Sequence, residues 1–373
     1  MRLDYTSRIA AFRRAMTTAS IDLAAIGPSS HMDWLIGFHP HSDERLCLLL
    51  IGPATETLVL GALNADGTRT RTDVAFHVWE DDIGPTKTLV EAISFVGSAN
   101  AKQIVLDETM RADFALLVID ALPSARTSLV NEALGFLRMR KDSAERLLLK
   151  ANATIADRAM STAYAAICPG MSEKGLASVI QAQLAKDGAS LEFCIVASGA
   201  NGAIPYHETG TRQFKEGDAV LIDFGGRYQG FLSDISRMAV VGYPPQAYDR
   251  IHCLVESAVK AGLQAARPGV FARDVDAAVR GVIAEAGYGE FFTHRTGHGL
   301  GIDLHEPPYI TGTSDTLLQE GMVFSIEPGV YLPGRFGVRL EEIVILHADG
   351  AEVLSALPRR VHVSSHPIIR NQG

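Results

Sequence analysis

The chain has 373 residues, which is more than one hydrophobic core usually serves, and two domains are therefore predicted. Its composition, 47% hydrophobic and 21% charged, is ordinary for a globular protein and excludes a disordered or fibrous chain. The formal net charge of -9 is spread along the chain without a basic stripe, which argues against nucleic acid and against an anionic membrane surface as partners.

The N-terminal segment MRLDYTSRIAAFRRAM mixes acidic and basic residues and has no apolar run before a small-residue cleavage site, so no export signal is expected. No apolar stretch approaches the ~20 residues that cross a bilayer. Four cysteines stand far apart in apolar surroundings, which favours buried free thiols over disulfides: Cys47, Cys168, Cys194 and Cys253. We therefore expect a cytoplasmic protein.

Residues 1–138 are predicted to form an α/β domain. Residues 7–20 have apolar side chains at helical spacing, which indicates a helix. Strand-like runs follow at IDLAAIG, RLCLLLIG, ETLVLGA, FHVWE and KQIVLDE, and helix-like segments at TKTLVEAISFVG and RADFALLVIDAL. This alternation predicts a sheet flanked by helices.

Residues 139–373 are predicted to form an α+β domain. Asp142 or Ser143 can cap a long helix, and Ser172 can start a second one. Two further helical patterns occur at YDRIHCLVESAVKAGLQAA and ARDVDAAVRGVIAEAG. Strands are expected at LEFCIVASG, DAVLIDFGG, SDISRMAVVG, MVFSIEPGVY and GVRLEEIVILH.

Four acidic residues of this second domain stand where the apolar face of a strand is expected: Asp223, Asp234, Glu327 and Glu341. A strand-end acid that faces water would explain any one of them. An isolated carboxylate in an apolar interior costs roughly several kcal/mol unless it is paired, protonated or bound to a metal. Four such residues together favour a metal site.

A hairpin centred between Tyr228 and Gln229 would set Asp223 directly opposite Asp234, about 5 Å away. Two bare carboxylates at that distance repel each other, so we expect a metal ion between them. In VRLEEIVIL, alternation along a strand puts Glu341 on one face and Glu342 on the other. We choose Glu341 as the ligand because it shares its face with Arg339.

The segment HRTGHGLGIDLHE contains three histidines, and His298 lies between two glycines. Beside four acids, His298 becomes the expected nitrogen ligand. One imidazole and four carboxylates form a hard, oxygen-rich set, which suits a pair of Mn²⁺, Co²⁺, Fe²⁺ or Zn²⁺ ions better than a structural zinc site.

Five strings, SGANGAIPYH, LIDFGGRYQGFLSDISR, HRTGHGLGIDLHEPPYI, FSIEPGVY and VRLEEIVIL, resemble the successive signatures of the Xaa-Pro peptidases. These aminopeptidase P and prolidase enzymes are relatives of methionine aminopeptidase and creatinase. The resemblance implies a pita-bread metallopeptidase domain at residues 139–373 and two divalent metal ions, with Mn²⁺ expected first. A weaker likeness in RIAAFRRAM and HMDWLIGF implies a creatinase-like N-terminal domain at residues 1–138. The family is often dimeric, so a homodimer is expected.

The resemblance also implies roles for the metal ligands. Asp223 would chelate one metal, whereas His298 and Glu327 would chelate the other. Asp234 and Glu341 would bridge the two metals. Glu327 is also the expected proton acceptor.

Further residues match positions that contact the substrate or support the site. His207 and His305 are expected to hydrogen-bond the reacting carbonyl, and His294, Tyr331 and Arg339 match positions that line the pocket or hold the bridging carboxylates. Many relatives have a histidine directly after the proline near residue 205, where this chain has Tyr206. We assign the role to the next residue, His207.

The expected reaction is hydrolysis of the bond before proline in a dipeptide or at the N-terminus of a longer peptide. One alternative is a metal-dependent, creatinase-like amidohydrolase of a small non-peptide metabolite. A second alternative is a catalytically inactive binding module on the same fold. The full set of five ligands argues against the inactive module.

Overall fold

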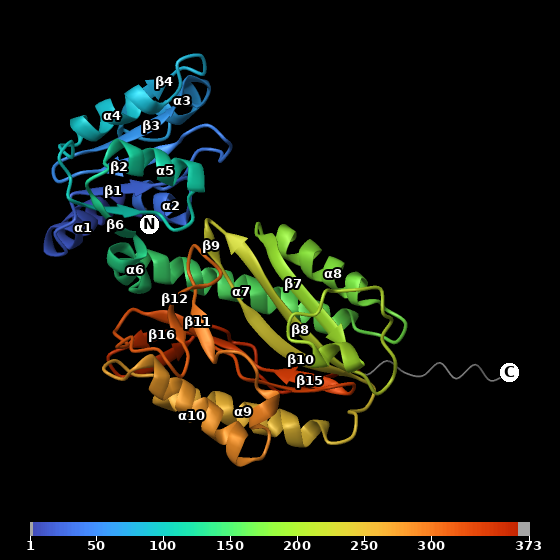
Figure 1. Cartoon of the computed structure of the whole chain (residues 1–373). Coiled ribbons are helices and arrows are strands. Elements are labelled where there is room, and N and C mark those ends of the chain that lie inside the picture. The colour runs from blue at the N-terminus through green and yellow to red at the C-terminus, as the bar shows by residue number, and fades with distance from the viewer. Residues whose placement is uncertain (1–2, 365–373) are drawn as a thin grey trace. The chain divides into compact units, whose positions relative to one another are not determined.

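The computed structural model describes residues 3–364. By its internal contacts the chain divides into two compact units, Met1–Arg138 and Met139–Gly373. Figure 1 shows both units as mixtures of helices and strands. No helix of the described residues is both long and apolar enough to cross a membrane.

The first unit is built on one six-stranded mixed sheet in the order β4-β3-β2-β1-β5-β6. Its strands are β1 (Leu23–Ile26), β2 (Leu48–Ile51), β3 (Glu56–Gly61), β4 (Ala75–Trp79), β5 (Gln103–Leu106) and β6 (Arg126–Leu129). Its helices are α1 (Tyr5–Thr18), α2 (Ser30–Ile36), α3 (Ala62–Arg69), α4 (Thr86–Phe95), α5 (Ala112–Ala121) and α6 (Asn131–Met139). Side chains of α4 and α5, including Leu89 and Phe114, pack on sheet residues such as Leu48 and Leu50.

The predicted α/β architecture of this unit is confirmed, and each predicted strand run and helix contains an observed element. Three helices and one strand, α2, α3, α6 and β6, were not predicted. The strand β6 has the sequence RTSL and is largely exposed, so no apolar alternation marks it. The helix α3, ALNADGTR, contains residues that favour turns.

The second unit contains two five-stranded sheets and a two-stranded one. The first sheet has the order β18-β10-β8-β7, with β9 paired to β8, and the second has the order β12-β11-β13-β16-β17. The first comprises β7 (Ser190–Ser198), β8 (Ala219–Tyr228), β9 (Phe231–Leu232), β10 (Ile235–Val241) and β18 (His362–Ser364). The second comprises β11 (Gly297–Gly299), β12 (Glu306–Ile310), β13 (Val323–Ile326), β16 (Glu342–His347) and β17 (Gly350–Val353), and β14 (Gly329–Leu332) pairs with β15 (Phe336–Arg339).

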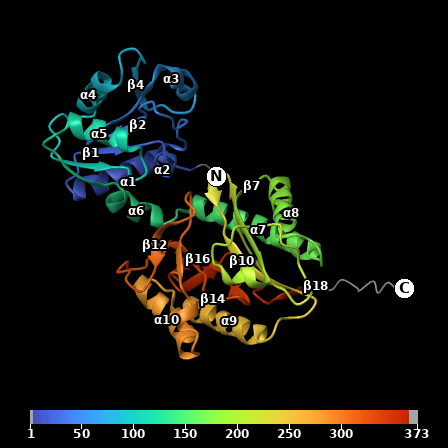
Figure 2. The same ribbon diagram turned by 45° about the vertical axis from the view of Figure 1, so that its right-hand side comes forward.

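Four helices cover these sheets: α7 (Ser143–Ala166), α8 (Glu173–Lys186), α9 (Tyr248–Ala265) and α10 (Ala272–Glu285). The predicted caps are confirmed. Asp142 and Glu145 form a reciprocal capping box at the start of α7, and the Ser172 hydroxyl accepts a hydrogen bond from the backbone of α8. In Figure 2, α9 and α10 lie side by side, as their contacts confirm.

Strand β8 has an apolar core on each of its faces. Ile222 and Phe224 pack with α7 and α8, whereas Leu221 packs with α9, α10 and the second sheet. Because side chains alternate along a strand, Asp223 shares the face of Leu221. The carboxylate is thus directed to the interior between the two sheets.

The four cysteines are free thiols, as expected, but they are not all buried. Cys47 is buried, Cys168 and Cys194 are half-buried, and Cys253 is exposed. The apolar neighbours of Cys253 in the sequence occupy the other face of α9, so the sequence context alone was misleading.

Candidate metal centre

The predicted metal ligands converge within the second unit from segments far apart in the sequence. Ligand atoms of Asp234, His298 and Glu341 all lie within 4.8 Å of one another. The His298 Nε2 atom is 3.1 Å from Glu327 Oε1 and 3.7 Å from Asp234 Oδ2. Asp223 lines the same cavity as Asp234, His298 and Glu327.

We predicted that all four acids lie inside strands, and this is wrong for three of them. Asp223 lies in β8 and His298 in β11. Asp234 directly precedes β10, Glu327 directly follows β13, and Glu341 lies between β15 and β16. A carboxylate beyond the hydrogen-bonded ladder can turn toward the centre without breaking strand pairing.

The predicted pairing of Asp223 with Asp234 is wrong. Asp223 pairs with Ser236, because the hairpin turns at Gln229-Gly230 rather than one residue earlier. Gln229 and Gly230 both have positive φ, as a two-residue type I′ turn requires. The register therefore shifts by two residues, which makes Asp223 and Asp234 diagonal neighbours on one face.

Several carboxylate oxygens at this centre are buried without a hydrogen-bond partner. They are Oδ1 of Asp223, Oδ1 of Asp234 and Oε1 of Glu341. Leaving a buried polar atom unsatisfied costs about 1–3 kcal/mol, and more for a charged group. Bound cations would satisfy these oxygens, and the donor set of four carboxylates and one imidazole fits such ions.

The pKa values show how strongly the acids are packed together. Burial raises the pKa of Asp234 well above its ordinary value, and the charges of Glu341 and Asp223 add to the shift. Burial and the charge of Glu327 likewise raise the pKa of Glu341. Burial also acts on Glu327, but its hydrogen bond with His298 prevails and lowers its pKa to about 2.

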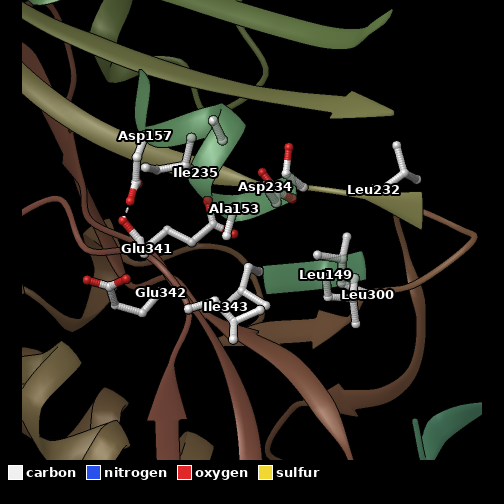
Figure 3. Close-up of a pocket in the computed structure, with 14 residues that line it drawn as sticks. Leu149, Ala153, Asp157, Leu232, Asp234, Ile235, Leu300, Glu341, Glu342 and Ile343 are labelled. Carbon is white, nitrogen blue, oxygen red and sulfur yellow. Dashed lines mark hydrogen bonds between the residues drawn. The ribbon is translucent and has the colours of Figure 1, made fainter. Parts of the chain in front are cut away.

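Hydrocarbon side chains lie behind the centre. Figure 3 shows Asp234 and Glu341 lining a small pocket together with Leu149, Leu232 and Leu300. This apolar backing excludes water from one side of the carboxylates, which explains their burial.

Glu342 takes part in a different set of contacts from Glu341. Its Oε1 accepts hydrogen bonds from Arg237 at 3.0 Å and from Arg359 at 2.7 Å. Arg237 is fully buried, and it also donates to the backbone carbonyl of Glu341. Sequence reasoning missed Arg237. The only available signal was a cation inside the apolar strand ISRMAVV.

A cavity of about 260 Å³ opens beside the carboxylates. Its apolar wall includes Phe193, Ile195 and Leu304. His305 lines the cavity, with its ring centroid 4.2 Å from that of His298. Burial and the neighbouring His298 lower the pKa of His305 to about 4, so its ring is neutral near pH 7.

A hydrogen-bonded chain connects the cavity wall to Asp223. The His294 ring and the Tyr331 hydroxyl are 2.8 Å apart, and Arg339 donates to that hydroxyl at 2.8 Å. Arg339 also pairs with the carboxylate of Asp223. His294 and Arg339 line the cavity, and Tyr331 connects them.

The His207 ring is paired with a buried carboxylate. Its Nε2 lies 2.9 Å from Oε2 of Glu173, a fully buried residue in the first turn of α8. Pro205 and Tyr206 line the cavity wall instead. Sequence reasoning missed Glu173, which also accepts hydrogen bonds from Ser198, Asn201 and Gly210. Its position near the start of a helix gives no sign of these distant partners.

The sequence model of metallopeptidase family M24 matches residues 148–348. The probable dipeptidase PepE of Mycobacterium tuberculosis is 37% identical over 367 residues, which cover 96% of each chain. The Xaa-Pro dipeptidase of Pyrococcus horikoshii is 35% identical over 234 residues, covering 62% of this chain and 67% of the relative.

Solved structures resemble the whole chain. The prolidase of Thermococcus sibiricus superposes with a TM-score of 0.91 at 33% identity, covering 98% of this chain and all of that one. The dipeptidase PepE of Mycobacterium ulcerans gives a TM-score of 0.92 at 34% identity, with 97% and 99% covered. Both likenesses extend over the two units, and they agree with the pita-bread architecture predicted for the second.

Proposed function

Because this chain belongs to metallopeptidase family M24, we propose that it hydrolyses the Xaa-Pro bond of dipeptides with a pair of divalent metal ions. The observation that carries this proposal is the set of three buried, unpartnered carboxylate oxygens beside His298. Relatives named Xaa-Pro dipeptidase and prolidase support the substrate class. They also favour a peptidase over the creatinase-like alternative.

In this proposal Asp223 would hold one metal, and His298 and Glu327 would hold the other. Asp234 and Glu341 would be shared by the two ions, which accords with the strongly raised pKa values of both acids. Mn²⁺ is the proposed ion, and Co²⁺, Fe²⁺ or Zn²⁺ would suit the same donors. When bound, such a pair supplies Lewis acidity that lowers the pKa of water and polarises a carbonyl group.

The chain's own residues orient the substrate and move the proton. Glu327, which lines the cavity beside His298, would accept the proton of the attacking water. His305 is neutral and can donate a hydrogen bond to the carbonyl oxygen of the scissile bond. His294 and Tyr331 hold Arg339, which in turn orients Asp223.

Proline imposes its own requirement on the site. A bond to proline is a tertiary amide without an N–H, so a peptidase cleft that pairs with the substrate backbone cannot hold it well. We propose that Phe193, Ile195 and Leu304 receive the ring, since they form the apolar wall beside the carboxylates.

We propose that the role expected of His207 is divided between His207 and Tyr206. Tyr206 lines the cavity and would contact the substrate. His207 pairs with the buried Glu173 and thereby fixes the loop that carries Tyr206.

We further propose that the protein acts in the cytoplasm as a homodimer. Its four free thiols suit a reducing compartment. The dimer follows from the family resemblance and is tested by sedimentation of the purified protein.

The decisive experiment compares Ala-Pro with Ala-Ala as substrates, before and after chelation. The enzyme should cleave Ala-Pro far faster, lose that activity on chelation and regain it with Mn²⁺. Full activity in the chelated sample would disprove the metal mechanism. Equal rates on both peptides, or turnover of a small amide alone, would disprove the substrate assignment.

A further inference from the structure

The loop between β11 and β12, residues 300–305, carries two of the side chains that line the metal cavity. Leu304 belongs to the apolar wall, and His305 is the proposed carbonyl donor. The loop forms neither helix nor strand, so no regular ladder of backbone hydrogen bonds fixes its shape. Other contacts must therefore set the position of the His305 ring.

The first half of the loop is attached to the β8–β9 hairpin. The backbone amide of Leu232 donates to the Gly301 carbonyl at 2.8 Å. The guanidinium of Arg227 donates to the Ile302 carbonyl at 3.0 Å. Both bonds act on the start of the loop, and the end that carries His305 depends on a different support.

A buried ion pair supports the second half of the loop. Glu306, the residue directly after His305, pairs with Lys141, and both side chains are buried. The second carboxylate oxygen of Glu306 accepts a hydrogen bond from the Asp303 amide at 3.4 Å. Neither Lys141 nor Glu306 lines the cavity, so the pair does not touch a substrate there.

The pair is anchored at Lys141 and packs closely against the loop. The backbone amide of Lys141 donates to the Gly321 carbonyl at 2.8 Å, and the Arg146 side chain donates to the Lys141 carbonyl at 2.9 Å. A Cβ atom at Gly301 would lie 2.7 Å from Glu306 Oε1 and 3.0 Å from Lys141 Nζ. The charged atoms therefore lie directly against the loop backbone.

Stability alone does not explain a charged pair at this place. Two ions lose their hydration when they are buried, and apolar residues of similar size often stabilise a fold equally well or better. A buried pair with satisfied hydrogen bonds does restrict geometry, because each charged group is costly without its partner. Its position directly beside His305 indicates which geometry it restricts.

We propose that Lys141 and Glu306 are positioning residues, whose ion pair holds the His305 ring where it can donate to the scissile carbonyl. This inference rests on the proposed Xaa-Pro peptidase function and adds the support for the role given there to His305. A reacting group misplaced by about 1 Å can lose about 100-fold in rate. A loop without its ion pair should therefore leave the fold intact and slow the reaction.

The test replaces the pair by apolar residues, Lys141→Met/Glu306→Leu, and measures kcat and KM for Ala-Pro in the Mn²⁺-loaded enzyme. The midpoint temperature of unfolding should equal that of the wild type or exceed it. The kcat should fall about 10- to 100-fold and KM should change less than about threefold, because the donor acts mainly in the transition state. Lys141→Met/Glu306→Gln, which keeps an acceptor for the Asp303 amide, should retain more activity.

Two further measurements separate positioning from a general structural role. In a His305→Ala background, Lys141→Met/Glu306→Leu should lower kcat by less than about twofold, because the residue through which the pair acts is gone. Hydrogen exchange of the metal-free protein, followed by mass spectrometry, should be faster in residues 300–305 of the double variant and unchanged in α8.

Lys150→Met/Glu352→Leu is the matched control. It removes a Lys–Glu pair of 2.6 Å that joins α7 to β17, and neither residue lines the cavity. Its kcat and its exchange in residues 300–305 should equal those of the wild type.

Three results would overturn this inference while leaving the peptidase function intact. They are a wild-type kcat in Lys141→Met/Glu306→Leu, an undiminished loss of kcat when that change is added to His305→Ala, and unchanged hydrogen exchange in residues 300–305. A wild-type enzyme that cleaves no Ala-Pro would instead overturn the proposed function, and the role of the pair with it.

Discussion

At the scale of single residues, the chemistry depends on acids that the fold buries close together. Asp234 and Glu341 each have an unpartnered buried oxygen and a strongly raised pKa. An apolar pair of the same size would stabilise the metal-free fold better. Their presence is therefore a cost to stability that a bound ion offsets.

Replacing either bridging acid by its amide should have opposite effects with and without metal. Asp234→Asn or Glu341→Gln should lower the metal content measured by elemental analysis, whereas His305→Ala should retain it. In the chelated protein the same two amides should raise the melting temperature, because they remove a buried like charge. Equal metal loss in all three variants would contradict the proposed ligand roles.

Glu173 should make the stability of the protein depend on acidity. Burial opposes its ionisation, but hydrogen bonds from His207, Asn201 and Ser198 prevail and lower its pKa. A carboxyl group with a lowered pKa in the folded state stabilises the fold above its unfolded pKa of about 4.3, and this stability is lost as the pH falls through the folded value.

Glu173→Gln should therefore destabilise the protein at pH 7, by about 1–3 kcal/mol if buried donors lose their partner. The difference from the wild type should shrink as the pH is lowered below about 4.3. Urea denaturation at several pH values measures both effects. Glu285→Gln, at an exposed position of α10, is the control and should change little. If the difference in the free energy of unfolding between Glu173→Gln and the wild type does not vary with pH, this account of Glu173 is contradicted.

At the scale of elements, Arg237 connects strand β10 by hydrogen bonds to the segment that carries Glu341. It is fully buried and donates to the backbone carbonyls of Ser236 and Glu341 and to the side chain of Glu342. These bonds connect β10 with the start of β16. The proposed ligands Asp234 and Glu341 stand at the ends of the connected segments, so Arg237 sets the spacing between them.

Arg237→Met should destabilise the protein by about 3–5 kcal/mol, because it leaves the buried Glu342 with only one cationic partner. The double variant Arg237→Met/Glu342→Leu should recover part of this loss, since neither buried charge then remains. Urea denaturation gives both free energies of unfolding. Metal content should fall in both variants, because the carbonyl of Glu341 is released. A double variant less stable than the single one would rule out the charge-pair explanation.

At the scale of the whole molecule, the two units have separate hydrophobic cores, and the metal centre belongs to one of them. Leu48 and Phe114 belong to the core of Met1–Arg138. Leu221 and Phe324 belong to a core of Met139–Gly373. Both tryptophans of the chain, Trp34 and Trp79, lie in the first unit.

This distribution allows the effect of metal on each unit to be measured in the intact chain. Metal at 100 times its Kd stabilises the unit that binds it by about 2.7 kcal/mol. Chelation should therefore destabilise the second unit and lower the midpoint temperature of unfolding measured by far-ultraviolet circular dichroism by about a few degrees. The midpoint temperature measured by tryptophan fluorescence should fall less, because both tryptophans lie in the first unit. Equal shifts of both signals would show that the units unfold together.

The sequence by itself determined most of the elements and the kinds of residue at the centre. The capping residues Asp142 and Ser172, and the apolar periodicities around them, act over a few residues, so local reading located the helices. Acids in apolar strands likewise identified the candidate ligands, because an unpaired buried charge is costly wherever the fold places it.

The tertiary structure alone decided how these residues meet. The turn at Gln229-Gly230 set the register of β8 on β10 and made Asp223 a diagonal neighbour of Asp234. Packing also directed the His207 ring to Glu173, which is 34 residues away in the chain. Local pattern carries no information about such partners, because contacts between distant segments depend on how whole elements pack and on which buried polar atoms still need a partner.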